Sequence, residues 1–256
     1  MLLALANATG GNGLKQAHRC AAHLLRHARI DDDTLSWPSP DPQTVTANLT
    51  GLSHGAGGIG WALITLGCRD DHPGYVDAGR RAFAYEARHF DHDEQDWYDL
   101  RRIAGGRFRN GRHYANAWCN GTAGIGMTRI HSWALLGKDD DAMLQEARQA
   151  LTATMRGFPR LMNDSLCHGR SGNAELFLRF AGLADEPAFR MEANVQAQAQ
   201  WRNLEDARPG PESGFFPGLM LGLAGFGMHF LRLARPESTP SALLLDPPGM
   251  PSPSKE

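Results

Sequence analysis

The stretches Ala117–Gly124 (AWCNGTAG) and Leu166–Gly172 (LCHGRSG) share one arrangement of residues, and this arrangement indicates both the fold and the functional site of the chain. Each places a side chain that can bind metal just before a Gly-x-x-Gly turn. The thiols of Cys119 and Cys167 and the imidazole of His168 therefore come from matching turns, which indicates one site built from two parts of the sequence. A cation that favours nitrogen and sulfur ligands, most often zinc, is the expected occupant.

The Gly-x-x-Gly turn belongs to a repeat that runs along most of the chain. Full copies begin at residues 55, 121 and 222, and a looser copy begins at residue 169. An apolar run follows each copy and alternates with polar segments whose apolar residues recur at spacings of three and four, whereas strand-like alternation is nearly absent. The sequence therefore predicts an all-α fold of stacked helical hairpins. The polar segments are Leu14–Arg29, Tyr75–His89, Asp141–Met155 and Ala188–Leu204.

Aligning the copies on their first glycine brings the candidate site residues into register. His54 and His168 both come just before that glycine, and Cys119 and Cys167 both come two residues before it. Equivalent positions in a closed ring of hairpins face the same end of the ring axis, so we expect these four side chains to converge. The glycines are expected to form the tight starts of buried inner helices, where a side chain would collide with a neighbour.

Composition and charge exclude several classes of protein. The chain has 256 residues, a net charge of −2 and four cysteines. No basic field favours binding to nucleic acid or to an anionic membrane, and four cysteines are too few for a disulfide scaffold of this length, which suits a reducing cytoplasm. The apolar stretch Gly214–Phe230 is shorter than the roughly 20 residues that a membrane span needs, and Pro217 and several glycines interrupt it.

The repeat also sets the expected domain organisation. Residues 1–235 contain every copy and form one domain, whereas residues 236–256 are rich in proline and are expected to be an extended or disordered tail. Long loops are expected between hairpins, at residues 30–50 and 90–116. The acidic run at residues 91–96 lacks the glycine and terminal Glu of an EF-hand and is interpreted as a solvated loop.

Three protein ligands leave one of the four tetrahedral positions of zinc open, which is the pattern of a catalytic site. A fourth ligand from Cys20, Cys68 or His113 would make the site structural. Two thiolates lower the Lewis acidity of the metal, which suits it to hold a third, reactive thiolate. The alternative is that the two cysteines of the turns bind no metal and serve only as small, buried apolar residues.

His54 is the candidate acid or base, because imidazole titrates near neutral pH. The alternative is a histidine that caps a helix or satisfies backbone groups, and the equivalence of His54 to His168 favours the functional interpretation. A third class of protein, a glycosidase on a ring of helices, needs a pair of carboxylates that the glycine turns do not carry.

Several of these stretches resemble LanC-type lanthionine cyclases. The likeness runs from about Thr50 to Pro248. Other stretches, among them Trp97–Arg101 (WYDLR), are most similar to the cyclase domain of class II bifunctional synthetases, the LanM type. The motifs that carry the resemblance are Gly51–Gly55 (GLSHG), Trp118–Gly121 (WCNG), Cys167–Gly169 (CHG) and Gly218–Gly225 (GLMLGLAG).

The resemblance implies an α/α toroid whose central zinc is held by Cys119, Cys167 and His168. It also implies a reaction, the Michael-type addition of a peptide cysteine to dehydroalanine or dehydrobutyrine, which forms a thioether ring in lanthipeptide (lantibiotic) biosynthesis. The substrate would be a dehydrated precursor peptide, His54 would handle the thiol proton or protonate the enolate, and the expected location is the bacterial cytoplasm.

The chain departs from the family pattern in ways that affect these expectations. It supplies about four of the seven hairpins of the family ring. No motif before His54 matches a family Asp that assists proton transfer, and the dehydratase region of a bifunctional synthetase is absent. We therefore expect an N-terminally truncated cyclase domain that forms a partial ring, with another chain supplying the missing repeats or dehydratase. The alternative is a non-catalytic, zinc-containing module that binds a peptide or a thiol, left from a split or decayed synthetase.

Overall fold

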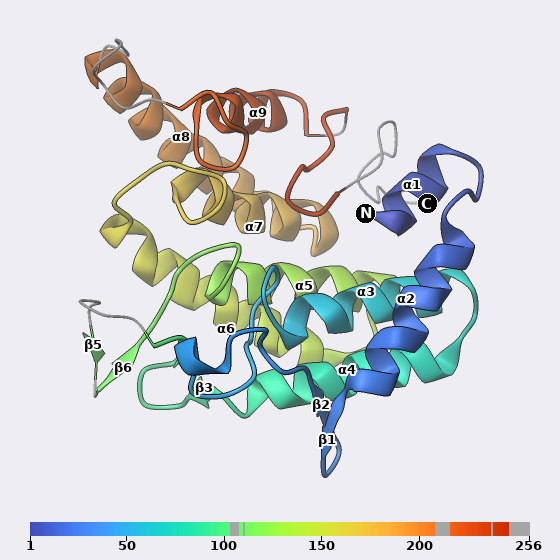
Figure 1. Cartoon of the computed structure of the whole chain (residues 1–256). Helices are drawn as coiled ribbons and strands as arrows, with labels where there is room; N and C mark the ends of the chain where they lie inside the picture. The colour runs from blue at the N-terminus through green and yellow to red at the C-terminus, as the bar shows by residue number, and fades with distance from the viewer. Residues whose placement is uncertain (103–107, 110, 208–215, 237, 246–256) are drawn as a thin grey trace.

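Stacked pairs of helices form the body of the molecule (Figure 1). The computed structural model describes residues 1–102, 108–109, 111–207, 216–236 and 238–245. The helices within these residues are α1 (Leu2–Ala8), α2 (Leu14–His27), α3 (Ala56–Arg69), α4 (Pro73–Ala87), α5 (Thr122–Leu135), α6 (Asp141–Gly157), α7 (Arg170–Leu183), α8 (Ala188–Ala207) and α9 (Leu223–Ala234). The pairs are α3 with α4, α5 with α6 and α7 with α8, and α3, α5, α7 and α9 pack successively against one another as an inner row.

The inner helices begin at the repeat glycines because a side chain does not fit there. A Cβ on Gly58 would overlap the Leu52 carbonyl oxygen, and a Cβ on Gly124 would overlap the Trp118 carbonyl oxygen. The loop before each helix folds back over the helix start, which confirms the role expected for these glycines. The backbone hydrogen bonds that hold it there, 2.7 to 3.3 Å long, run from Ala56 to Leu49, from Thr122 to Ala115, from Arg170 to Asn163 and from Leu223 to Phe216.

Burial separates the inner row of helices from the outer one, as the hydrophobic pattern predicts. Helices α5 and α7 bury residues on every side, whereas α6 buries one face through Met143, Ala147, Ala150 and Leu151. One continuous apolar core joins residues of α3 through α9. Of the helices in the described ranges, none combines the length and the apolar composition that crossing a membrane requires.

A fully buried ion pair links the outer and inner helices to one of the repeat turns. Arg129 Nη1 of α5 lies 2.9 Å from Glu86 Oε2 of α4, and Arg129 Nε lies 2.7 Å from Glu146 Oε2 of α6. The other oxygen of Glu86 accepts the Gly51 N–H at 2.5 Å. The Glu86 carboxylate therefore fixes the turn that leads to His54.

The loops between the helix pairs contain short antiparallel strands that the sequence does not indicate. Each strand is two or three residues long, too short for a visible alternation of polar and apolar residues. Two 3₁₀ turns, η1 (Pro42–Thr44) and η2 (Phe158–Arg160), complete the loops. The strand pairs are β1 (Arg29–Asp31) with β2 (Thr34–Ser36), β3 (Phe90–Asp91) with β4 (Asp96–Trp97), and β5 (Phe108–Arg109) with β6 (Arg112–His113).

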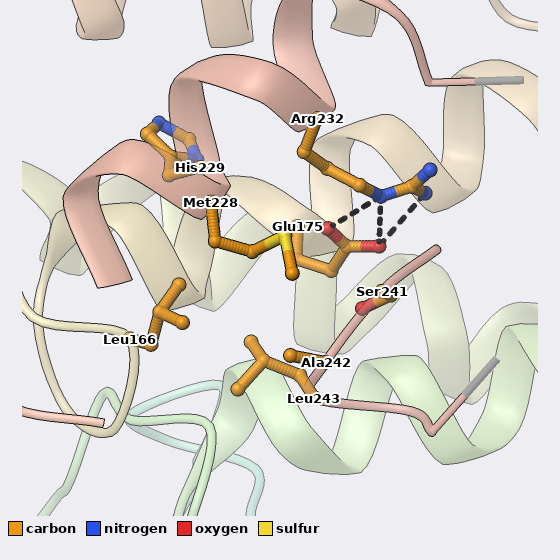
Figure 2. A pocket seen from close by; sticks show the side chains of 8 residues that line it. All are labelled: Leu166, Glu175, Met228, His229, Arg232, Ser241, Ala242 and Leu243. Atoms are coloured by element: carbon orange, nitrogen blue, oxygen red, sulfur yellow. Dashed lines mark hydrogen bonds and ion pairs between the residues drawn. The ribbon is translucent and has the colours of Figure 1, made fainter. Parts of the chain in front are cut away.

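The packed region continues past residue 235, the predicted end of the domain. Leu243 and Leu244 are buried. Arg232 of α9 donates hydrogen bonds to the Pro236 and Thr239 carbonyl oxygens, and it also pairs with Glu175 of α7 at 3.0 Å (Figure 2). The segment after α9 is thereby tied to the inner row, while residue 237 and residues 246–256 of the expected tail lie outside the described residues.

The glycine starts of the inner helices make the first testable prediction. Gly124→Ala should lower the free energy of unfolding by about 1–3 kcal/mol or more, because the new methyl group must displace backbone as well as the Leu52 side chain. Gly182→Ala is the matched control: Gly182 lies in α7 with open space around its Cα, so the substitution should stabilise the protein by roughly 0.5–1 kcal/mol. Urea unfolding measures both, and equal effects of the two substitutions would contradict the packing described here.

Candidate metal centre

A ladder of backbone hydrogen bonds joins the four repeat turns. The Cys167 amide donates to the Met220 carbonyl at 3.0 Å, the Cys119 amide donates to the Cys167 carbonyl at 3.3 Å, and the Ser53 amide donates to the Cys119 carbonyl at 3.0 Å. These residues are the equivalent positions of the repeat, each two residues before the first glycine. The predicted convergence is therefore confirmed for the backbone of these turns, at the N-terminal ends of the inner helices.

The ladder places the two thiols next to each other. Cys119 is buried, Cys167 is half-buried, and their side chains are hydrogen-bonded. Burial, together with the adjacent Cys119, raises the pKa of the Cys167 thiol to about 12. The Cys167 thiol therefore stays protonated at neutral pH when no cation is close. A bound metal ion reverses this, because a coordinating thiol is deprotonated, so the donor pair fits a soft cation.

The structure brings the two thiols together without the third predicted ligand. His168 follows Cys167 in the ladder turn, where its backbone amide donates to Ser165 Oγ at 3.3 Å and its side chain is exposed. Across the described ranges, no three His, Cys, Asp or Glu side chains lie close enough together to hold a metal ion. Of the three predicted ligands, Cys119 and Cys167 are thus the two whose side chains lie together in the structure.

His54 lies in the ladder turn that precedes α3. Its ring is exposed, yet the surrounding protein partly removes it from water. This desolvation, followed by the charge of Arg101, lowers the pKa of His54 below its ordinary value near 6.5, and Asp99 acts in the opposite direction. The imidazole is therefore neutral at neutral pH and can accept a proton.

Asp99 and Arg101, to which the repeat assigns no role, reach the same region. The Asp99 carboxylate is fully buried, 2.7 Å from Arg101 Nη2 and 3.4 Å from His113 Nδ1. The charge of Arg101 also acts on both cysteine sulfurs of the ladder. The stretch Trp97–Arg101 (WYDLR) was the part of the sequence that could have indicated these two residues. It has no counterpart in the repeat, so the repeat could not predict where it lies in the fold.

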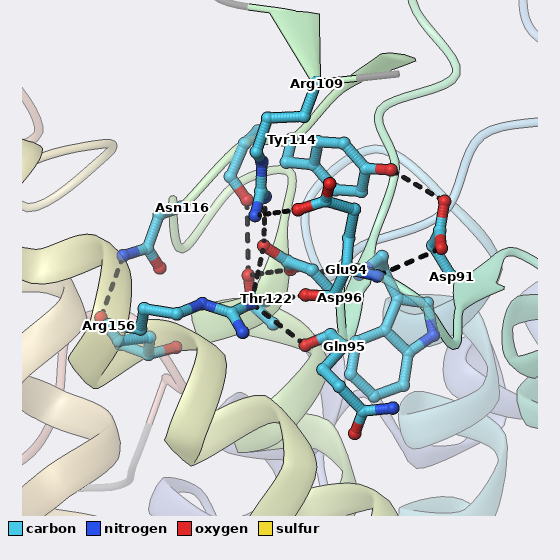
Figure 3. Close-up of polar contacts among 12 residues, drawn as sticks. Asp91, Glu94, Gln95, Asp96, Arg109, Tyr114, Asn116, Thr122 and Arg156 are labelled. Carbon is cyan, nitrogen blue, oxygen red and sulfur yellow. Dashed lines mark hydrogen bonds and ion pairs between the residues drawn. The ribbon is translucent and has the colours of Figure 1, made fainter. Parts of the chain in front are cut away.

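Polar contacts hold residues 94–96, shortly before Asp99 and Arg101 in the chain, against helices α5 and α6 (Figure 3). Asp96 lies 2.9 Å from Arg109 Nη2 and accepts a hydrogen bond of 3.1 Å from Thr122 Oγ1 at the start of α5. Arg156 of α6 donates to the Glu94 carbonyl oxygen at 2.7 Å. The loop is therefore anchored to the first turn of one inner helix and to the last turns of one outer helix.

Asp91 anchors the start of the same loop. Its carboxylate accepts hydrogen bonds from Tyr114 Oη at 2.7 Å and from Arg112 Nη1 at 2.8 Å. The bond from Tyr114, followed by that from the Glu94 amide, lowers the pKa of Asp91 to about 2. The interpretation of residues 91–96 as a solvated acidic loop is therefore wrong for Asp91 and Asp96, whose charges are matched by arginines later in the loop and in α6.

The alternative fourth ligands have other surroundings. Cys20 is exposed on α2, outside the inner row. Cys68 lies near the C-terminal end of α3. A helix rises 1.5 Å per residue, so Cys68 is about 18 Å along the helix axis from the helix start, where the ladder lies. His113 lies beside the buried Asp99 carboxylate. The thiol pair at the ladder thus has no further cysteine of the chain near it.

A pocket between α7, α9 and residues 241–243 lies one residue away from Cys167, because Leu166 lines it (Figure 2). It has room for about one water molecule. The ion pair between Glu175 and Arg232 lies beside it, and burial lowers the pKa of His229 to about 4, so that this ring is neutral. These contacts join α9 to α7 and hold the last turn of the ladder in place.

Together these features define an all-α protein of stacked helical hairpins with a thiol pair at the N-terminal ends of its inner helices. Residues 1–244 match the family model described as lanthionine synthetase C-like protein, and the chain belongs to this family. The search of curated proteins gave no match.

A solved structure of nisin cyclase shows the fold. It matches with a TM-score of 0.60 and 23% sequence identity, over 77% of this chain and 50% of the nisin cyclase chain. The predicted fold class is confirmed: the helices form an α/α toroid, here as part of the ring. The chain spans half the length of the nisin cyclase that it matches.

The second testable prediction concerns the effect of the Arg101 charge on the pKa of His54. Arg101→Gln should raise the pKa of the His54 imidazole, because the guanidinium charge lowers it. Histidine side-chain NMR titrations of wild type and variant would measure the change. Arg112→Gln is the control, since Arg112 pairs with Asp91 on the same loop and should leave the His54 titration in place. A His54 pKa that is the same in all three proteins would contradict the arrangement.

Proposed function

We propose that this chain is a zinc-dependent lanthionine cyclase domain. It adds the cysteine thiols of a dehydrated precursor peptide to dehydroalanine or dehydrobutyrine and so forms the thioether rings of a lanthipeptide. The observation that carries the proposal is the adjacent Cys119 and Cys167 thiols at the backbone ladder, in a chain that belongs to the lanthionine synthetase C-like family.

The proposed zinc ligands are Cys119, Cys167 and His168. The Cys167 thiol is costly to ionise alone because it is half-buried beside Cys119, and the two sulfurs match the preference of zinc for sulfur and nitrogen ligands. The exposed ring of His168 follows Cys167 in the same turn and is the proposed third ligand. Two thiolates and one neutral imidazole would balance the charge of Zn²⁺ and would leave one position for the substrate thiol.

His54 is the proposed acid and base. Its neutral ring, in the turn beside Cys119, accepts the proton that the substrate thiol loses, and the protonated ring then donates a proton to the α-carbon after the addition. Zinc, when bound, supplies the positive charge that keeps a thiol ionised at neutral pH. The exposure of the site at the helix ends would admit a peptide rather than only a small molecule.

The exposed apolar residues at the end of the inner row suggest a partner. Leu221 and Leu231 of the last repeat are 56% and 58% exposed, and a further hairpin packed against α9 would cover this face. We propose that such a hairpin comes from another part of the polypeptide or from a second chain, with a LanM-type dehydratase as one source, and that the assembly works in the cytoplasm. If the partial ring is inactive alone, the second candidate function is a zinc-containing module that binds a peptide or a thiol.

Zinc content gives the third testable prediction. The purified chain should bind about one zinc ion, and Cys119→Ala and Cys167→Ala should each remove most of it, because two remaining ligands hold zinc weakly. Cys20→Ala, at an exposed position on α2, is the control that should keep it. Elemental analysis measures all four proteins. A folded wild type without zinc, or variants with unchanged zinc, would refute the ligand set.

Cyclase activity gives the fourth prediction. With a dehydrated precursor peptide, the zinc-loaded chain should consume one peptide thiol for every ring formed, and His54→Asn should lower the rate about 10²–10⁴-fold while zinc content stays unchanged. Mass spectrometry after thiol alkylation counts the rings. A zinc-loaded wild type that binds the peptide but forms no ring would favour the binding module over the cyclase.

A further inference from the structure

The ion pair between Asp99 and Arg101 holds the Arg101 guanidinium group in one orientation. Arg101 Nε lies 3.1 and 3.2 Å from the two oxygens of Asp99, and Nη2 lies 2.7 Å from Oδ2. The Asp99 carboxylate is fully buried, whereas the Arg101 side chain is 38% exposed. Within the part of the chain that the structure describes, the remaining nitrogen, Nη1, has no protein acceptor. The pair thus fixes the guanidinium group of a partly exposed side chain and uses three of its hydrogen-bonding contacts on Asp99.

Backbone contacts tie the segment of Arg101 to the one that leads into the His54 turn. Arg101 forms an antiparallel bridge with Val45, and the amide of Thr46 donates to the Leu100 carbonyl oxygen at 2.8 Å. The segment that begins at Val45 leads into the His54 turn, and the loop of Arg101 leads into the Cys119 turn. The bridge therefore ties Arg101 to the segment that precedes the His54 turn.

The charge of Arg101 reaches the reacting groups. It acts on the sulfurs of both Cys119 and Cys167 and on the imidazole of His54. Asp99 also accepts the Arg101 amide at 2.9 Å and lies 3.4 Å from His113 Nδ1, so the carboxylate that orients the guanidinium is itself held in place. An oriented, partly exposed guanidinium beside a thiol site is suited to bind an anionic oxygen.

We propose that Arg101, oriented by Asp99, is the oxyanion-binding catalytic residue of this site, with Nη1 donating a hydrogen bond to the carbonyl oxygen of the dehydroamino acid. The proposal rests on the proposed cyclase function and deepens it. It names the group that stabilises the negative charge, a task separate from activation of the thiol and from proton transfer by His54.

The step balances without an oxidant or a reductant. The thiolate electron pair forms the bond from sulfur to the β-carbon, and the electron pair of the carbon–carbon double bond moves towards the carbonyl, which places negative charge on its oxygen. The proton that the thiol lost then returns to the α-carbon, and the carbonyl is restored. Arg101 stays protonated throughout, and the product contains every atom of the two reactants.

Steady-state cyclisation of the zinc-loaded chain tests this role. Removal of one oxyanion donor typically lowers kcat by about 10²–10³-fold. We expect a loss of this size for Arg101→Gln, with little change in KM or zinc content, a smaller loss for Arg101→Lys, and an intermediate loss for Asp99→Asn. Arg112→Gln, on the same loop, is the matched control and should keep the wild-type kcat. An Arg101→Gln variant with wild-type kcat would overturn the proposal.

A second measurement does not depend on cyclase activity. In the metal-free protein, alkylation of Cys167 by negatively charged iodoacetate and by neutral iodoacetamide is compared, with exposed Cys20 as the internal reference. The rate ratio of the two reagents cancels the thiolate fraction and reports the local charge. We expect Arg101→Gln to lower the ratio at Cys167 several-fold and to leave the ratio at Cys20 unchanged.

An unchanged ratio at Cys167 would overturn the placement of Arg101, whatever the activity. If the ratio falls but the zinc-loaded wild type forms no rings, the proposed function fails and the oxyanion role fails with it, while Arg101 stands as an anion-binding residue. The two failures are therefore distinguishable.

Discussion

The backbone ladder at the starts of the inner helices is the constraint on which the site depends. It connects one equivalent residue from each of four repeat turns, and so it sets the spacing of Ser53, Cys119, Cys167 and Met220. The ladder can form only where the turns lie close against the helix starts, and this needs glycine at positions such as Gly58 and Gly124. The same small residues that allow close packing thus bring two thiols into contact.

The charged groups around the ladder have two different tasks. The buried pair of Glu86 and Arg129 is fully enclosed and holds the Gly51 turn through a backbone N–H. Loss of Arg129 would leave the buried Glu86 carboxylate without this charge partner, which typically costs about 3–5 kcal/mol, so the pair maintains the fold. The pair of Asp99 and Arg101 instead has one buried and one partly exposed member. Only the second arrangement can offer a charge to a ligand.

The sequence predicted what the repeat controls and missed what the loops contribute. Periodic apolar residues and recurring glycines were enough to predict the helical hairpins and the convergence of the turns. Asp99 and Arg101 escaped because their position comes from ion pairs such as that between Asp96 and Arg109, which link residues of one irregular loop without any period. The same pairs explain why the acidic run was misinterpreted. The ring of His168 was predicted to join the thiols, and its place in a metal site stays a prediction.

X-ray absorption at the zinc edge of the zinc-loaded chain would test the central claim most directly. The account predicts two sulfur ligands at about 2.3 Å and nitrogen or oxygen ligands at about 2.0–2.1 Å, one of them an imidazole. Addition of a small thiol should raise the count to three sulfurs, because the open position accepts the substrate thiol. A zinc ion bound only by nitrogen and oxygen, or a shell that does not change when thiol is added, would contradict the account.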